Sequence, residues 1–134
     1  EPTNFECVKV NNSKVIYEFI LPFFDQDTIQ YSEEFLVLVL NNQYQTKGVF
    51  VHSVGGITGT IVDTRKLMST ILLTGCIHFV LFHNHPSGKL EFSQSDIDIT
   101  QKIKKICAVL EVNMVDHIVV TPFGYVSMAD EGIL

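Results

Sequence analysis

Basic residues, cysteines and long apolar runs are all scarce in this 134-residue sequence. Lys and Arg number 9 against 15 Asp and Glu, which gives a net charge of -6. Non-specific affinity for DNA comes mainly from Lys and Arg on phosphates, so this charge argues against DNA binding by the surface as a whole, although not against a small basic patch. No apolar run approaches the roughly 20 residues that a membrane span needs, so we expect no membrane contact.

The three cysteines, Cys7, Cys76 and Cys107, are widely spaced and form no Cys-x-x-Cys pair. An odd number at such spacing excludes a disulfide framework and predicts reduced, partly buried thiols in a reducing compartment. No basic-then-apolar signal peptide opens the chain. We therefore expect a cytoplasmic protein.

The sequence is otherwise that of a folded protein, with 46% hydrophobic and 18% charged residues. It contains no internal repeat, low-complexity tract or linker, and we expect residues 1–134 to form a single domain. A chain of this length buries roughly two-thirds of the surface that its unfolded form exposes.

Apolar periodicity and turn residues predict alternating helices and strands. Helical spacing covers residues 13–24, 63–74 and 93–110, and strand-like runs cover residues 35–40, 48–53, 77–82, 117–121 and 125–128. Ser13 is the expected N-cap of the first helix, Asp63 caps the second and Gly75 ends it. This order predicts an α/β fold in which one mixed sheet carries helices on both faces, as three α/β/α layers.

A polar loop, residues 83–92, is expected after the most apolar strand and begins His83-Asn84-His85. Residues i and i+2 of a strand point the same way, so both imidazoles can face one point. Asp96 follows eleven residues later, in the first turn of the expected helix. Two histidines and one carboxylate would give Zn²⁺ three ligands and leave a fourth position for water, whose pKa the metal lowers to about 7.

These residues also have purely structural explanations. Ser93-x-x-Asp96 before an apolar run is close to a helix capping arrangement, and a histidine pair in a polar loop is compatible with a solvated turn. Capping and ligation are compatible, because one carboxylate oxygen can hold the metal while the other accepts a backbone N–H.

The spacing of these residues is similar to that of a known family. His83-x-His85-Pro86 followed by Ser93-x-x-Asp96 resembles the metal motif of the JAB/MPN (JAMM) metalloproteases. The fuller string from His83 to Gly88 resembles the RadC branch more closely. Further matching pieces are Glu33-x-Phe35, Arg65 and Asp116-His117. The resemblance extends from about residue 10 to the end of the chain.

This resemblance implies a cytidine-deaminase-like three-layer fold and one Zn²⁺ per chain, bound by His83, His85 and Asp96. It also implies that Glu33 activates the metal-bound water and then protonates the leaving amine, while Ser93 stabilises the oxyanion. The implied reaction is hydrolysis of an amide or isopeptide bond, with a peptide or an isopeptide-linked protein as substrate.

Glu34 competes with Glu33 for the role of general base. A shift of one residue turns a side chain to the other face of a strand, so only one of the two can face the histidines. The need for such a group follows from the chemistry alone, because a metal-bound water requires a nearby proton acceptor.

The sequence departs from the RadC pattern between Gly55 and Lys66. RadC-like chains usually have His-Pro-Arg-Glu where this one has Asp63-Thr64-Arg65-Lys66, and often Ser/Thr-x-Asn where this one has Thr58-Gly59-Thr60. Full-length relatives carry an upstream helix-hairpin-helix segment suited to DNA, which these residues do not supply. We therefore expect any DNA role to be indirect.

Three alternatives stand beside a zinc hydrolase. The first is a RadC-type metal-binding module associated with DNA repair, with little or no peptidase activity. The second is a catalytically silent scaffold, against which the intact ligand trio argues. The third is an Fe(II) site, disfavoured because its usual His-x-Asp/Glu order differs from His-x-His. The letters His-Asn-His also spell the name of a nuclease family, but those residues are not contiguous there.

Three further histidines have no assigned ligand role. His78 lies in an apolar strand and is expected to be a satisfied structural residue, and His52 ends a strand with no visible partner. His117 follows Asp116, for which a supporting or sheet-edge role is compatible with the pattern.

Overall fold

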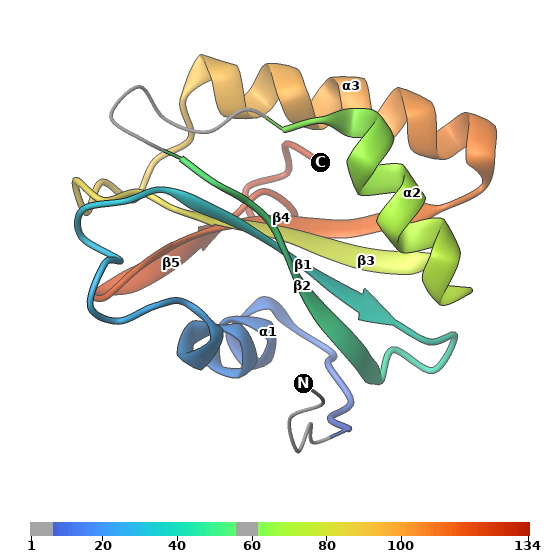
Figure 1. Cartoon of the computed structure of the whole chain (residues 1–134), viewed down its shortest axis with the longest axis horizontal. Coiled ribbons are helices and arrows are strands. Elements are labelled where there is room, and N and C mark those ends of the chain that lie inside the picture. The colour runs from blue at the N-terminus through green and yellow to red at the C-terminus, as the bar shows by residue number, and fades with distance from the viewer. Residues whose placement is uncertain (1–6, 56–61) are drawn as a thin grey trace.

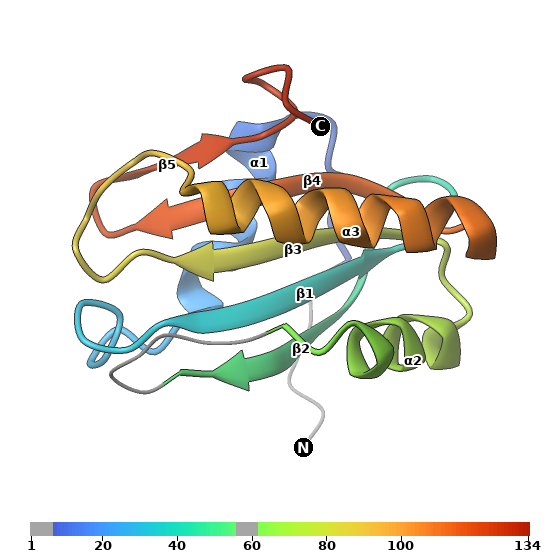
Figure 2. The ribbon, with the colours of Figure 1, turned by 90° about the horizontal axis from the view of Figure 1, so that it is seen from above.

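A five-stranded mixed sheet forms the centre of the computed structural model, which describes residues 7–55 and 62–134. The strands are β1 (Glu34–Leu40), β2 (Thr46–Val54), β3 (His78–Asn84), β4 (Asn113–Thr121) and β5 (Gly124–Ser127). Their spatial order is β2-β1-β3-β4-β5, and β3 and β4 run parallel while the other neighbours are antiparallel (Figure 2).

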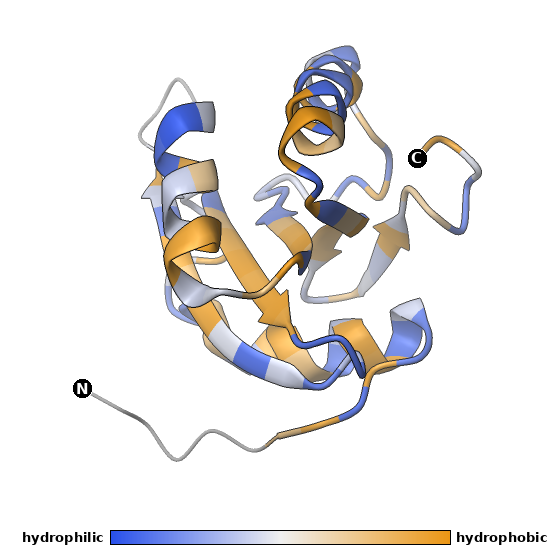
Figure 3. Cartoon of the chain, turned by 90° about the vertical axis from the view of Figure 1, so that its right-hand side faces the viewer, coloured by the Kyte–Doolittle hydropathy of each residue, from blue (hydrophilic) through white to orange (hydrophobic). Residues whose placement is uncertain are grey.

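Helices cover both faces of this sheet, which confirms the expected α/β layering. The helix α1 (Ser13–Ile20) lies on one face, and α2 (Thr64–Thr74) and α3 (Gln94–Leu110) lie on the other (Figure 1). Alternate side chains of each strand therefore enter two separate cores, with Leu36 and Leu38 on the α1 side and Val37 and Val39 on the other. The strands are accordingly largely apolar, as Figure 3 shows.

The ends of α2 are those that the sequence predicts. The Asp63 side chain accepts hydrogen bonds from the backbone N–H groups of Arg65 and Lys66. Gly75 ends the helix in the left-handed conformation, with φ of 74°, which glycine adopts without a steric penalty.

The first helix is shorter than predicted. Its N-cap is Asn12 and not Ser13, and the α-helix ends at Ile20 instead of continuing to Phe24. A 3₁₀ turn, η1 (Leu21–Phe23), follows and contains Pro22. Proline has no N–H to continue the α-helical hydrogen bonds, so the chain leaves the helix there.

The strand β3 is longer than predicted, because the expected loop at 83–92 begins two residues too early. His83 and Asn84 continue the strand, since His83 pairs with Phe35 of β1 and Asn84 with Val120 of β4. Two strands begin earlier than their apolar runs, β2 at Thr46 and β4 at Asn113.

The buried face of α3 does not follow the apolar residues of the helix, which are Ile97, Ile99, Ile103, Ile106 and Leu110 among others. Leu110 is 40% exposed, and the buried residues are Asp96, Thr100, Ile103 and Cys107. The two buried residues nearest the start of α3, Asp96 and Thr100, are polar. The spacing of apolar residues in the sequence therefore could not identify them as buried.

Part of the glycine loop, including Gly56 and Thr58-Gly59-Thr60, lies outside the described residues. Gly55, the last described residue before it, donates its N–H to the carbonyl of Glu33 at 2.6 Å. The loop therefore begins directly beside Glu33.

The described cysteines are all unpaired, as expected, and they differ in exposure. Cys7 is exposed, Cys76 is partly buried and Cys107 is buried in the core between α3 and the sheet. Among the described helices, none is long and apolar enough to cross a bilayer.

We predict that the exposed thiol of Cys7 and the buried thiol of Cys107 differ sharply in reactivity. Burial raises the pKa of Cys107 to about 11, so this side chain carries almost no reactive thiolate at pH 8. Cys7 should react with a thiol reagent in the native protein and Cys107 only after unfolding in urea, as followed by peptide mass spectrometry. Equal labelling of both in the native state would contradict this packing.

Candidate metal centre

His83 is the most rigidly held member of the histidine pair. It lies in the central strand β3, is fully buried, and stacks on Phe35 with ring centroids 4.7 Å apart and an interplanar angle of 24°. The carboxyl ends of β3 and β4 meet at this edge of the sheet, which is where binding sites form in α/β folds. The strand backbone and the Phe35 ring therefore fix the direction of the imidazole.

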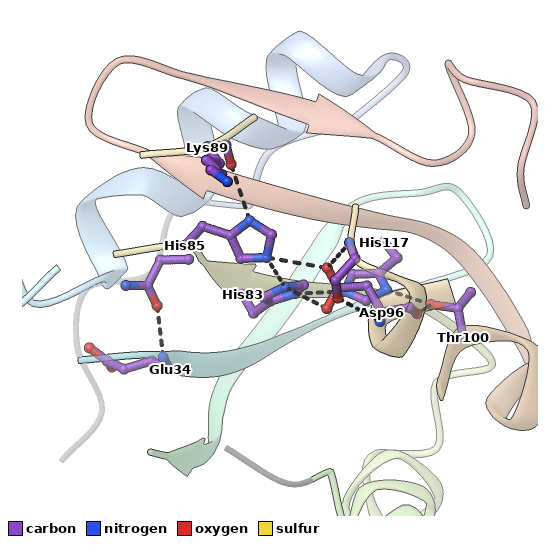
Figure 4. Close-up of polar contacts among 9 residues, drawn as sticks. Glu34, His83, His85, Lys89, Asp96, Thr100 and His117 are labelled. Carbon is purple, nitrogen blue, oxygen red and sulfur yellow. Dashed lines mark hydrogen bonds and ion pairs between the residues drawn. The ribbon is translucent and has the colours of Figure 1, made fainter. Parts of the chain in front are cut away.

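His85 follows immediately after β3 and is held by the backbone of β4 and of its own loop. Its N–H donates to the carbonyl of Val120 at 3.2 Å, and its carbonyl accepts from Gly88 at 2.9 Å. The ring Nδ1 lies 3.1 Å from the carbonyl oxygen of Lys89. Because a carbonyl can only accept, Nδ1 carries the proton, and Nε2 is the atom that faces the site (Figure 4).

Asp96 performs the capping and the site-forming roles together. It is the third residue of α3, and with Ser93 it forms a capping box in which Ser93 N–H donates to Asp96 Oδ2 at 2.9 Å. Asp96 Oδ1 lies 3.1 Å from His83 Nε2, and Oδ2 lies 3.2 Å from His85 Nε2. The carboxylate of Asp96 thus contacts both histidines while it also caps the start of α3.

The three donor groups fit a tetrahedral metal ion. The two Nε2 atoms are 2.9 Å apart, and ligand atoms of all three residues lie within 4.8 Å of one another. Ligand atoms bonded to zinc at about 2.0–2.1 Å lie about 3.3 Å from one another in a tetrahedron. His83, His85 and Asp96 therefore provide one triangular face of such a site, and the fourth position remains for water or substrate.

The electrostatics of the site also favour a bound cation. Burial would raise the pKa of the Asp96 carboxyl, but contacts from His83 and His85 hold that pKa well below its usual range. The hydrogen bond to Asp96 raises the pKa of His85, against the effect of burial. The carboxylate thus remains ionised and attracts positive charge, which a proton on His85 or a metal ion can supply.

The start of β1, which begins at Glu34, turns the two neighbouring glutamates different ways. Glu33 directly precedes this strand and lines a cavity of about 290 Å³ with Phe35 and Asp96, together with Val62, Ser95, Ile99 and Lys102. Glu34 points away from the histidines (Figure 4). Burial raises the pKa of Glu34, a backbone hydrogen bond at Asp25 opposes this effect, and the negative charge of Asp25 adds to it.

Asn84 fixes the register at the start of β1. Its side-chain oxygen accepts from the N–H of Glu34 at 2.7 Å, and its amide nitrogen donates to the carbonyls of Ile29 and Ser32, each at 2.8 Å. Asn84, which lies between the two histidines, therefore holds the segment around Glu33 in place through hydrogen bonds to the residues on both sides of it.

Ser93 lies at the rim of the site. Its Oγ accepts from Asp96 N–H at 3.0 Å, and the side chain is exposed. Because Oγ is the acceptor in this bond, the hydroxyl hydrogen is available to donate to a substrate.

Two buried residues lie behind His83, namely His117, for which the sequence left a supporting role open, and Thr100, which was not predicted as part of the site. His117 Nε2 lies 2.8 Å from His83 Nδ1, and Thr100 Oγ1 lies 2.6 Å from His117 Nδ1. Full burial and the charge of His83 hold the pKa of His117 well below its usual range. The sequence signal for Thr100 is its i+4 spacing from Asp96, which places both on one face of α3.

The remaining histidines lie away from this cluster. His52 does have a partner, contrary to the expectation from sequence, because its Nε2 accepts from the backbone N–H of Asp63 at 3.1 Å. His78 packs against Tyr44 with tilted rings and contacts the Asn113 side chain at 3.0 Å, so it is a structural residue as expected.

A sheet with helices on both faces and a two-histidine, one-aspartate site at the start of α3 is consistent with a JAB/MPN-like domain. The family model described as the RadC-like JAB domain matches residues 10–133, and the chain belongs to this family.

The chain is also similar to curated proteins that share the name UPF0758. It is 41% identical to one from Flavobacterium johnsoniae over 125 residues, which cover 93% of this chain and 53% of that protein. It is 34% identical to one from Porphyromonas gingivalis, with 93% and 54% covered, and 30% identical to one from Methanosarcina mazei, with 94% and 54% covered. The chain thus spans about half the length of these relatives.

We predict that the purified protein binds about one zinc ion per chain and that His85→Ala abolishes this binding, because two remaining ligands hold zinc weakly. Metal content after dialysis, measured by elemental mass spectrometry, tests both statements. His78→Ala is the matched control and should keep its zinc. Full zinc content in His85→Ala would show that the ligand set is wrong.

Proposed function

We propose that this domain is a zinc-dependent hydrolase of the JAMM type, which cleaves a peptide or isopeptide bond. The convergence of His83 Nε2, His85 Nε2 and the Asp96 carboxylate beside the cavity lined by Glu33 carries this proposal. The sheet order and the helices on both faces support the cytidine-deaminase-like form of the fold.

His83, His85 and Asp96 would hold the metal, which supplies a water activated for attack at neutral pH. Glu33 would take a proton from that water as general base and deliver it to the leaving amine as general acid. Its position on the cavity side of β1 supports this role. The exposed Ser93 hydroxyl would donate to the oxygen on which negative charge develops.

The substrate belongs to the proposal as well. A peptide or an isopeptide-linked protein fits a site whose cavity combines the apolar side chains of Phe35 and Ile99 with the cationic Lys102. Three unpaired cysteines support a place in the reducing cytoplasm. The net charge of -6 supports a protein partner over direct contact with DNA.

The neighbouring glutamates provide a matched pair of variants for the test. Glu33→Gln should keep the zinc and lower turnover of an internally quenched peptide library by about 10²–10⁴-fold, because it removes the general base. Glu34→Gln should leave turnover close to that of the wild type, because this side chain lies on the opposite face of β1.

Zinc content is measured for both variants alongside turnover. Loss of turnover in Glu34→Gln, with activity retained in Glu33→Gln, would reverse the assignment of the base. If the zinc-loaded wild type cleaves no member of the library, the hydrolase proposal fails for such substrates, and a metal-binding module without peptidase activity becomes the better description.

A further inference from the structure

A buried chain of hydrogen bonds runs from the backbone of α3 to the back of the His83 ring. Thr100 Oγ1 lies 2.8 Å from the Asp96 carbonyl and 2.6 Å from His117 Nδ1. His117 Nε2 in turn lies 2.8 Å from His83 Nδ1. Thr100 is 2% exposed and both histidines are 0% exposed, so no solvent replaces a missing partner.

The backbone carbonyl of Asp96 determines which group donates and which accepts in each of these hydrogen bonds. A carbonyl oxygen only accepts, so the single hydroxyl hydrogen of Thr100 is donated to it. Thr100 Oγ1 must then accept from His117, which places the His117 proton on Nδ1.

The position of the proton on His117 then determines which nitrogen of His83 is protonated. With its proton on Nδ1, a neutral His117 presents the lone pair of Nε2, which can only accept from His83 Nδ1–H. His83 Nε2 is consequently left with its lone pair, and this is the atom 3.1 Å from Asp96 Oδ1 and 2.9 Å from His85 Nε2.

The opposite direction would disable the site. If Thr100 donated to His117 Nδ1, His117 would donate from Nε2 and His83 would carry its proton on Nε2. That proton would point at the metal position, and a protonated ring nitrogen cannot bind a metal.

We propose that Thr100 and His117 are positioning residues that hold His83 in the one tautomer able to bind the metal. This inference rests on the proposed metal-binding function. It assigns Asp96 a third task beside capping and site formation, because its backbone carbonyl accepts from Thr100 and so determines which nitrogen of His83 is protonated.

The isosteric variant Thr100→Val tests the role of the hydroxyl. It leaves His117 Nδ1–H without an acceptor and favours the opposite tautomers of His117 and His83. We expect zinc affinity, measured by competition with a chromophoric chelator, to fall about 10–100-fold, the range for loss of the group that fixes the tautomer of a metal-binding histidine, because His117 no longer holds its acceptor nitrogen toward His83. Thr100→Ser keeps the hydroxyl and should restore the wild-type affinity.

Thermal unfolding of both variants separates positioning from packing. If Thr100→Val lowers the melting temperature but binds zinc as tightly as the wild type, Thr100 has only a structural role and the inference is overturned. The same conclusion follows if Thr100→Ser is as impaired as Thr100→Val.

The tautomers themselves can be read without metal. In the ¹⁵N-histidine-labelled, metal-free wild type, long-range ¹H–¹⁵N spectra should show protonated Nδ1 on both His83 and His117. A proton on Nε2 of a neutral His83 would overturn the inference. If Nδ1 is protonated but the wild type binds no zinc, the proposed function fails while the tautomer assignment stands.

Discussion

The contact between His83 in the centre of the sheet and Asp96 at the start of α3 is the constraint around which the rest of the structure is arranged. It brings a carboxylate, 8% exposed, against a fully buried imidazole, which is costly unless each polar atom is satisfied. The surrounding groups meet most of this requirement, and a cation bound between His83 Nε2 and Asp96 Oδ1 would meet the rest. Ser93 binds one carboxylate oxygen from the backbone, His85 contacts it from the loop, and His117 satisfies the far side of the His83 ring.

This constraint also explains which parts of the fold are visible in the sequence. The ends of α2 are local, because Asp63 and Gly75 act through their own backbone neighbours, and both follow from residue type alone. The extent of β3 is not local. His83 and Asn84 are polar residues that suggest a loop, yet pairing with β1 and β4 on both sides keeps them in the strand.

The residues of the candidate site also divide into those that the sequence reveals and those that only the structure reveals. His83, His85 and Asp96 lie within a 14-residue stretch, so spacing alone indicates that they can meet. The choice between Glu33 and Glu34 depends on the register of β1 against β3, which Asn84 fixes from the opposite face of the sheet. His117 belongs to a pair that matches the family pattern and Thr100 does not stand out in the sequence, and only the packing of α3 on β4 reveals the hydrogen bond between them.

The chain distance between these groups has a consequence for how the site assembles. The candidate metal ligands His83, His85 and Asp96 belong to one β3–α3 unit, whose closure costs little entropy, whereas Glu33 arrives only when β1 pairs with β3 across a separation of about 50 residues. A partly folded chain can therefore bring His83, His85 and Asp96 together before Glu33 is in place. If the proposed function holds, metal binding and hydrolysis would depend on different stages of folding.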